Sequence, residues 1–367
     1  MRSALVRVGE ISALAALPLI ALAIGLATFS SQDRVALDFH HELYPQAELV
    51  VDGKDPYPPP DADLRDGTNL IWPMAAVLPV VPLTLLSPAA ADWVATAIVL
   101  AALVATLWVL DVRDWRVYGV TLVWPPVIDS YQTANVTLPL ALLIALTWRY
   151  RDRALAAGLS LGVALALKFF LWPVAVWLLA TGRRGAAGIS VAVGAASLVL
   201  LLPWIDPLDY ARLIRNLSDT FDGFSYTPYA LLVDLGLASE IARPLTLLLG
   251  VSILALAWRR RSLGLALGAA LVFSPIVWRH FFALLLVPLA VARPRLDAAW
   301  LLPLGFWLVP GTYNGEPWQT ALALAVCGAT LLACETTRRT RLAVPDASPL
   351  ARGFAGSGPG RSRPGAS

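Results

Sequence analysis

The sequence predicts an all-α polytopic membrane protein, and three observations support this fold class. Of the 367 residues, 58% are hydrophobic and only 14% are charged, with a mean hydropathy of +0.67, which is too apolar for a soluble domain. The apolar residues form long runs separated by short breaks that carry arginine. Because a backbone inside a bilayer must satisfy its own hydrogen bonds, we expect each run to be a helix.

The expected membrane segments follow one another along most of the chain. They are Ile11 to Phe29, Leu70 to Leu86, Asp92 to Leu110, Val117 to Ile128, Thr133 to Trp148, Ala154 to Ala166, Phe169 to Ala180, Ala186 to Pro203, Pro244 to Trp258, Ser262 to Ile276, Phe281 to Ala292, Ala298 to Pro310 and Gln319 to Cys334. The first run exceeds the apolar core of a secretory signal and lacks a clear cleavage site, so we interpret it as an anchored span. We expect ten to thirteen crossings.

The number of crossings between residues 70 and 130 stays open. Two full spans between Leu70 and Leu110 would place the following break, Asp111 to Arg116, on the wrong side for the pattern of charges. One segment there is therefore expected to be incomplete, either Leu70 to Leu86, with its three prolines, or the short segment at Pro125 and Pro126. Proline-broken helices survive at membrane depth where they line a cavity.

The charged breaks predict the orientation of the chain. Five breaks are rich in arginine: Arg149 to Arg153, Arg183 and Arg184, Arg259 to Arg261, Arg293 to Arg295, and Arg338 to Arg341. Positive loops remain in the cytoplasm. The alternate breaks, Asp206 to Asp222 and Gly311 to Trp318, are acidic or neutral and should face outside. We therefore expect a multi-pass protein of the cell membrane with both termini cytoplasmic, consisting of a membrane domain at residues 1–344 and a disordered cytoplasmic tail at residues 345–367.

The polar stretch from Ser30 to Asn69 is the first expected outer loop. It holds nine carboxylates against three basic residues, and Asp38 lies near its start, close to the membrane surface. Water, a substrate and a charge can meet at such a position. We interpret residues 30–69 as a catalytic loop and Asp38 as its key acid, although a solvated loop carboxylate would fit the spacing equally well.

Motifs of soluble enzymes are absent from the sequence. It contains no glycine-rich phosphate loop, HExxH or CxxC motif, and we expect neither a cofactor nor a bound metal. Polar residues inside apolar runs are the remaining signal, because they are costly in a membrane. Lys168 and the pair Arg279 and His280 interrupt two such runs at expected outer ends, where they could bind an anion or act only as interfacial polar residues.

Four motifs in order resemble those of glycosyltransferase family 87, the polyprenyl-phosphate-mannose-dependent mannosyltransferases of actinobacterial type. The first motif is Asp38, Phe39, His40, His41, Glu42, Leu43 and Tyr44, followed by Gly53 to Tyr57. The others are Leu70 to Pro73, the small-residue helix Ala157 to Gly162 that ends at Lys168, and Ser274 to His280. The resemblance covers residues 38–289.

The resemblance implies a GT-C-type bundle whose first outer loop supplies the catalytic base. It implies that Asp38 takes the proton of the acceptor hydroxyl in a single-displacement, inverting transfer. Lys168, Arg279 and His280 would then bind the phosphate of the donor. In place of the family's Gly-Gln-x-Asn segment, this chain has Gln132 and Asn135 without the glycine, so these two residues contact substrate or simply cap a helix.

The same loop offers further residues for binding the acceptor or the sugar. His40 and His41 flank Asp38 and could orient the acceptor or the phosphate. Glu42 lies one helical turn away from Asp38 and is interpreted as a structural or acceptor-binding acid. Tyr57 is suited either to stacking on a sugar or to core packing.

Three classes of function remain open from the sequence. The first is an enzyme that transfers mannose from a polyprenyl-phosphate donor to a lipid-linked or envelope glycan on the outer face, or arabinose in a close variant. Its partners would be donor, acceptor and membrane lipids, with no nucleic acid. A transporter would show inverted repeats and polar residues at the midplane, which we do not find. A noncatalytic membrane scaffold would leave Asp38 unused.

Overall fold

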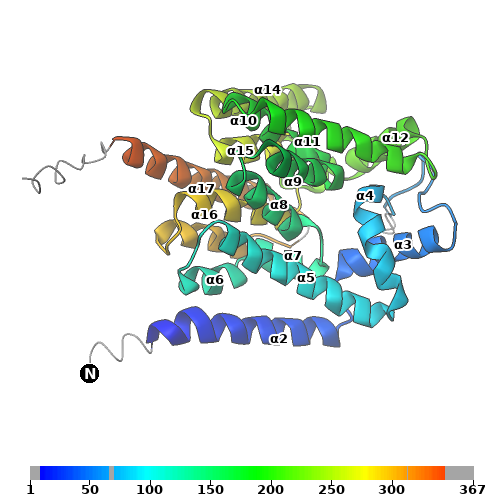
Figure 1. Ribbon diagram of the computed structural model, residues 1–367, viewed down its shortest axis with the longest axis horizontal. Helices are drawn as coiled ribbons and strands as arrows, with labels where there is room; N and C mark the ends of the chain where they lie inside the picture. The colour runs from blue at the N-terminus through cyan, green and yellow to red at the C-terminus, as the bar shows by residue number, and fades with distance from the viewer. Residues whose placement is uncertain (1–8, 66–69, 312, 344–367) are drawn as a thin grey trace, which may run out of the picture.

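The protein is helical throughout the part that the structure describes. The computed structural model describes residues 9–65, 70–311 and 313–343, and within these ranges it contains helices and no β-strand. Figure 1 shows the helices packed side by side, with α2 (Leu17–Ser31) at the edge of the bundle. The predicted all-α polytopic fold is confirmed, and it agrees with the GT-C-type bundle that the resemblance implies. The tail at residues 345–367 lies outside the described residues.

Among the described residues, five helices are long and apolar enough to cross a membrane. They are residues 9–31, formed by η1 (Ser12–Ala16) and α2; α5 (Pro88–Val109); α11 (Arg184–Ala196) with η5 (Ser197–Leu201); α14 (Ser239–Arg260); and α17 (Pro317–Ala343), whose apolar part ends at Thr336. The first is the least buried, because only 6% of its apolar window is covered by the rest of the protein. It therefore offers nearly its whole circumference to lipid.

In the part of the chain that the structure describes, seven shorter apolar segments complete the bundle. They are α4 (Met74–Val77) with η3 (Leu78–Leu85), α8 (Thr137–Arg149), α9 (Ala154–Leu167), η4 (Phe169–Leu171) with α10 (Trp172–Ala180), α15 (Leu263–Phe273), η7 (Arg279–Leu285) with α16 (Leu286–Ala292), and η8 (Ala298–Leu308). Several contain 3₁₀ turns, and Pro82 and Pro303 lie inside two of these turns. Irregular backbone of this kind is tolerated where protein covers it.

The region between residues 70 and 130 contains one long helix and three short ones. α5 spans 22 residues. The preceding segment, α4 with η3, has 12 residues, which reach roughly 24 Å even at the 3₁₀ rise and fall short of the hydrocarbon core of about 30 Å. α6 (Trp115–Leu122) and α7 (Pro125–Thr133) are shorter still. The segments at Leu70 to Leu86 and at Pro125 are both too short to cross unaided.

The small residues of α9 allow an unusually close approach to α11. A Cβ at Gly158 would lie 2.6 Å from the Cβ of Ile189, and one at Gly162 would lie 2.5 Å from the Cβ of Val193. Any larger side chain would push the two helices apart. Inside a membrane the hydrophobic effect does not drive helices together, because lipid tails are as apolar as the side chains. Close van der Waals packing through glycine is a common way for helices to associate there. Lys168 directly follows the last residue of α9.

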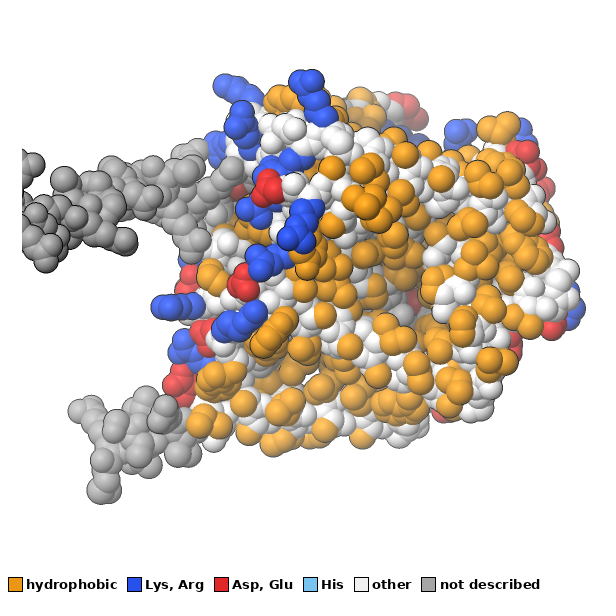
Figure 2. Space-filling view, in the orientation of Figure 1, with side chains coloured by type: hydrophobic (Ala, Val, Ile, Leu, Met, Phe, Trp, Pro, Cys, Tyr) orange, Lys and Arg blue, Asp and Glu red, His pale blue; other side chains and the backbone are white. Residues whose placement is uncertain are grey.

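The basic loops meet at one end of the bundle, which we call the arginine end. Arg149 lies 3.8 Å from Asp111, and Arg183 pairs with Asp152 at 2.8 Å. Arg116 reaches Glu10 at the start of the first span, at 2.7 Å. Figure 2 shows lysine and arginine side chains gathered at this end, where α2 begins and α17 ends, beside a broad apolar belt.

The acidic and aromatic loops meet at the opposite end, which we call the acidic end. It contains η2 (Phe39–Leu43), α3 (Tyr44–Val51), α12 (Pro207–Phe221), η6 (Asp222–Phe224) and α13 (Pro228–Asp234). The Asn216 amide of α12 donates to the Ala62 carbonyl at 2.8 Å, and the Asn314 amide donates to the Asp234 carboxylate at 3.1 Å. The three loops expected on the outer face therefore lie together.

Candidate active site

The first loop places Asp38 at the start of a helix. After α2 the chain turns back through two left-handed residues, Asp33 and Ala36, and Asp38 becomes the residue that precedes η2. Phe39 and Leu43 are buried, which anchors η2 against the bundle. Wide π-type turns such as η2 are rare and frequently occur at functional sites. Asp38 and Glu42 consequently lie one turn apart, each half-buried.

Asp38 faces polar groups from two distant segments. The polar side chains of Thr133, the last residue of α7, and of Asn135 just beyond it lie close enough to stabilise its ionised carboxylate, and Lys168 and Asp129 interact with it electrostatically. Burial raises the pKa of Asp38, whereas Lys168, Thr133 and Asn135 act in the opposite direction. A carboxylate with a raised pKa and such polar neighbours is suited to accept a proton near neutral pH.

Glu42 is held by the indole of Trp72. The Trp72 Nε1 group donates to Glu42 Oε2 at 2.6 Å, which is short for such a bond. Burial raises the pKa of Glu42, and the neighbouring Asp38 carboxyl raises it further. The positive charge of Lys168 acts in the opposite direction and lowers the pKa of both carboxyl groups.

The backbone at Trp72 is fixed by side chains from three elements. Gln46 of α3 accepts from the Trp72 amide and donates to its carbonyl, both at 3.2 Å. The buried Tyr57 hydroxyl donates to the same carbonyl at 3.1 Å, and Tyr210 of α12 donates to the carbonyl of Ile71 at 3.1 Å. The tyrosine rings of Tyr57 and Tyr210 contact edge to face. Tyr57 is thus a packing and hydrogen-bonding residue behind Trp72.

Lys168 lies between two aromatic rings. Its Nζ is 4.1 Å from the centre of the Trp72 ring and 5.6 Å from that of Phe281, which stacks on Phe170. Such cation–π contacts hold an ammonium group without consuming its hydrogen-bond donors. His280, buried in η7, interacts electrostatically with Lys168. We call Asp38, Glu42, Lys168 and His280 the Asp38 cluster.

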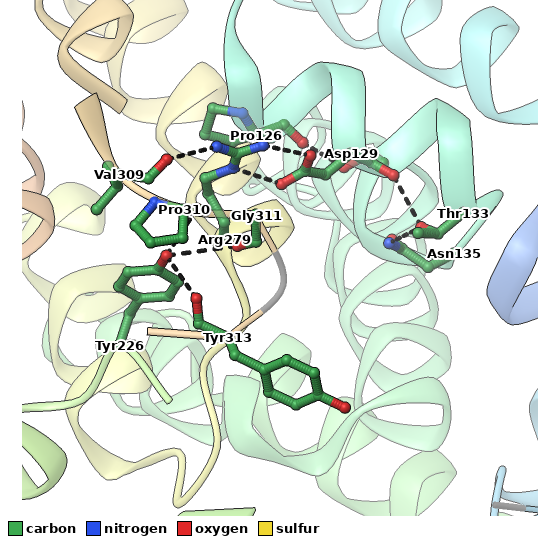
Figure 3. A network of polar contacts seen from close by, with 11 residues as sticks. Pro126, Asp129, Thr133, Asn135, Tyr226, Arg279, Val309, Pro310, Gly311 and Tyr313 are labelled. Carbon is green, nitrogen blue, oxygen red and sulfur yellow. Dashed lines mark hydrogen bonds and ion pairs between the residues drawn. The ribbon is translucent and has the colours of Figure 1, made fainter. Parts of the chain in front are cut away.

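Arg279 has a different environment from the rest of the predicted phosphate-binding set. It forms a bidentate pair with Asp129 of α7, with both N–O distances at 2.7 Å, and its Nη1 donates to the Val309 carbonyl at 2.9 Å (Figure 3). The side chains are only 13% and 12% exposed. Most of the guanidinium is therefore engaged within the protein.

The remaining predicted residues are divided between the cluster and its surroundings. Asn135 contacts Asp38 and also accepts from the Thr137 amide at 2.9 Å, so it both caps α8 and faces the site. Gln132 is half-buried on α7. His40 points instead to Asp92 of α5, with 2.8 Å between Nδ1 and the carboxylate, and His41 is exposed.

Several site residues were missed from the sequence. Thr133, Asp129 and Trp72 each contact a member of the Asp38 cluster or its neighbour Arg279. Asp129 carried a usable signal, because it is an acid inside a largely apolar segment at an outer end. In the described part of the chain, no three His, Cys, Asp or Glu side chains come together as a metal ligand set.

A comparison with protein-family models gives a match to glycosyltransferase family 87 over residues 71–288. The chain belongs to glycosyltransferase family 87. The matched range contains Trp72, Asp129, Lys168, Arg279 and His280 and begins after the loop that carries Asp38. No curated protein and no solved structure matches the chain. Membership of family 87, together with the apolar helices, makes the protein a membrane glycosyltransferase, which takes a sugar from a donor to an acceptor.

Proposed function

We propose that this family 87 enzyme transfers mannose from a polyprenyl-phosphate donor to an envelope glycolipid or glycan on the outer face of the cytoplasmic membrane. The observation that carries the proposal is the Asp38 cluster, in which an acid with a raised pKa lies beside Lys168 and His280 at the acidic end. A lipid-linked donor suits an enzyme whose site lies next to an apolar belt, because the polyprenyl tail stays in the bilayer.

Asp38 is the proposed base of a single displacement. It takes the proton of the acceptor hydroxyl as that oxygen attacks the anomeric carbon, and the donor phosphate leaves from the opposite face, which inverts the anomeric configuration. A double displacement would require a second carboxylate free to act as nucleophile or acid. Glu42 is engaged by the Trp72 indole at 2.6 Å, which favours a supporting role for it in placing Lys168 and the acceptor.

Lys168 and His280 are the proposed contacts for the departing phosphate. As the glycosidic bond breaks, negative charge grows on the phosphate oxygens, and donors fixed nearby stabilise the transition state more than the ground state. The aromatic rings around Lys168 hold its ammonium in place while leaving its N–H groups free to donate. Gln132, half-buried on α7 near Asn135, and the exposed His41 remain proposed acceptor contacts, with His40 held by Asp92.

The function is tested with the purified protein in lipid vesicles. Polyprenyl-phosphate mannose, polyprenyl-phosphate arabinose and nucleotide sugars, each radiolabelled, are offered with envelope lipids, and the anomeric configuration of the product is read by NMR. The proposal expects transfer from the mannosyl lipid with inversion and loss of transfer in Asp38→Asn. Transfer from arabinosyl lipid alone would change the sugar, and transfer from nucleotide sugars alone would refute the donor class.

The orientation of the protein is part of the proposal. We place the acidic end outside and the arginine end in the cytoplasm, with residues 1–344 forming the membrane domain and residues 30–69 its catalytic loop. The test uses a variant whose Cys327 and Cys334 are replaced by alanine. A cysteine at Lys54 should react with a membrane-impermeant maleimide in intact cells, and a cysteine at Arg184 only after permeabilisation. The reverse pattern would invert the topology.

A further inference from the structure

The Asp129–Arg279 pair is a buried contact between two segments that are 150 residues apart. The Arg279 Nε and Nη2 groups donate to the two carboxylate oxygens of Asp129, both at 2.7 Å, which is the geometry of a fork-shaped bidentate pair. A third donor, Nη1, is taken by the Val309 carbonyl. The guanidinium thus joins α7, η7 and the chain after η8.

The chain after η8 is fixed independently beside this pair. The Tyr226 hydroxyl lies 2.7 Å from the Pro310 carbonyl and 2.9 Å from that of Tyr313, and it can donate to either (Figure 3). The Tyr226 amide donates to the Val277 carbonyl at 2.8 Å, two residues before Arg279. The arginine is therefore held on both sides by backbone that is itself anchored.

A short path of contacts leads from the backbone of Asp129 to Asp38. The Thr133 hydroxyl donates to the Asp129 carbonyl at 2.8 Å, and the Asn135 amide donates to the Thr133 oxygen at 2.6 Å. Thr133 and Asn135 also lie beside the Asp38 carboxyl group and lower its pKa. The path runs along α7, which packs directly on η7. At the other end of the pair, Arg279 is followed in sequence by His280.

We propose that Asp129 and Arg279 form a positioning pair, which holds the polar neighbours of Asp38 in register with His280. In this assignment Arg279 acts through Asp129 and is not a ligand of the donor phosphate. The inference rests on the proposed function, because it gives the pair its role in the same transfer reaction. Displacements of about 1 Å at a reacting centre can cost as much as 100-fold in rate, so a rigid link of this kind matters.

The two alternative roles of Arg279, positioning residue or phosphate ligand, predict different results in a double-mutant cycle with Asp129. For a positioning pair, Asp129→Asn and Arg279→Gln each lower kcat by about 10- to 100-fold, leave the KM for the donor within about 3-fold, and are not additive when combined. For a phosphate ligand, Arg279→Gln raises the donor KM, while Asp129→Asn frees the guanidinium and leaves donor use intact. The second pattern would overturn the proposal.

A matched ion pair at the arginine end controls for general loss of stability. Arg116 binds Asp114 through Nε at 2.9 Å and Nη2 at 2.8 Å, and its Nη1 reaches Glu10. Asp114→Asn should lower the melting temperature without the fall in kcat seen for Asp129→Asn. Arg279→Lys keeps the positive charge but cannot form the bidentate contact with Asp129. Compared with Arg279→Gln, it should therefore be more stable but recover little of kcat. If Asp114→Asn reduces kcat as strongly, the effect is only structural and the proposal fails.

A second readout does not depend on activity. Hydrophobic carbodiimides react with protonated carboxyl groups, so mass spectrometry of labelled protein against pH follows the protonation of Asp38. Glu42, Lys168 and Asp129 are the charged groups that face it, and the Asp129 carboxylate raises the pKa of Asp38. Asp129→Asn should therefore shift labelling of Asp38 to lower pH. An unchanged profile would refute the link, whereas absence of sugar transfer by the wild-type protein would refute only the proposed function.

Discussion

The two ends of the bundle use charge in different ways. At the arginine end several charged side chains are exposed: those of Arg113 and Asp111 are 48% and 63% exposed and that of Asp152 is 74% exposed, whereas the Arg116–Asp114 pair is more covered, at 35% and 10%. At the acidic end the Asp129–Arg279 pair is almost covered, and Asp38 is desolvated. Exposed pairs contribute little to stability, and the sign of their charge is enough to orient a loop. Buried pairs depend on geometry, so the acidic end should be far more sensitive to substitution.

Among these substitutions, Asp38→Asn should reduce sugar transfer the most. A small effect would contradict the greater sensitivity of the acidic end. We expect transfer to fall at least about 100-fold, because an amide cannot accept the proton of the acceptor hydroxyl. The measurement is the initial rate of sugar transfer, with membrane insertion and thermal unfolding as controls. Activity equal to that of the wild-type protein would remove the base assignment.

Lys168→Met should lower transfer by about 10- to 100-fold, with most of the loss in the KM for the donor. Lys168 lowers the pKa of Asp38, so its removal raises that pKa further. Because the reaction needs the ionised carboxylate, the wild-type rate should fall as pH drops through a value above the ordinary 3.9 of aspartate, and the variant should lose activity at a still higher pH. The check is the pH–rate profile. A change confined to the acceptor KM would mean that Lys168 is misplaced.

His280→Ala should reduce donor use by about 10-fold, which is the effect expected for one lost hydrogen bond to a charged phosphate. The acceptor KM should stay constant. Donor titrations at fixed acceptor measure this, and His280→Gln serves as a partner variant that keeps a hydrogen-bond donor. If both variants alter acceptor binding alone, His280 lies on the acceptor side of the site.

Arg183→Gln, at the arginine end, should have the smallest effect on stability and activity. It therefore tests whether this end is less sensitive to substitution than the acidic end. Its partner Asp152 is 74% exposed, so we expect the free energy of unfolding to change by less than about 1 kcal/mol and the rate of transfer to stay the same. Thermal unfolding in detergent and the transfer assay test both. A loss of activity similar to that of the Lys168 variant would show that the two ends are not independent.

The fold could be predicted from the sequence because hydropathy reports directly on burial in lipid. The long helices were expected within a few residues, for example Pro88–Val109 against Asp92 to Leu110. The 3₁₀ turns in η3, η7 and η8 were not, because their backbone is set by neighbouring helices and not by local propensity. The sequence also left open which segments between residues 70 and 130 were short.

The site could be predicted in part, and the reason lies in the range of its contacts. Lys168 and His280 were identifiable because each is a polar residue that interrupts an apolar run, whereas Asp38 was selected among nine loop carboxylates by the family resemblance. The partners of Arg279 and His40 were not, because Asp129 and Asp92 are 150 and 52 residues away, and pairing over such distances leaves no local pattern. In the sequence Trp72 was only part of a motif. Nothing there indicated that its indole N–H would bind Glu42 while the face of its ring contacts Lys168.

The enclosure of Lys168 between Trp72 and Phe281 has a consequence for the choice of anion. Aromatic rings beside an ammonium group displace part of the water around an anion that binds there, and removing water from a dianion costs far more than from a monoanion. A singly charged phosphodiester can therefore dock where free inorganic phosphate is repelled. Inorganic phosphate should compete poorly with the donor even at millimolar concentration, and effective competition would indicate a wet, open pocket.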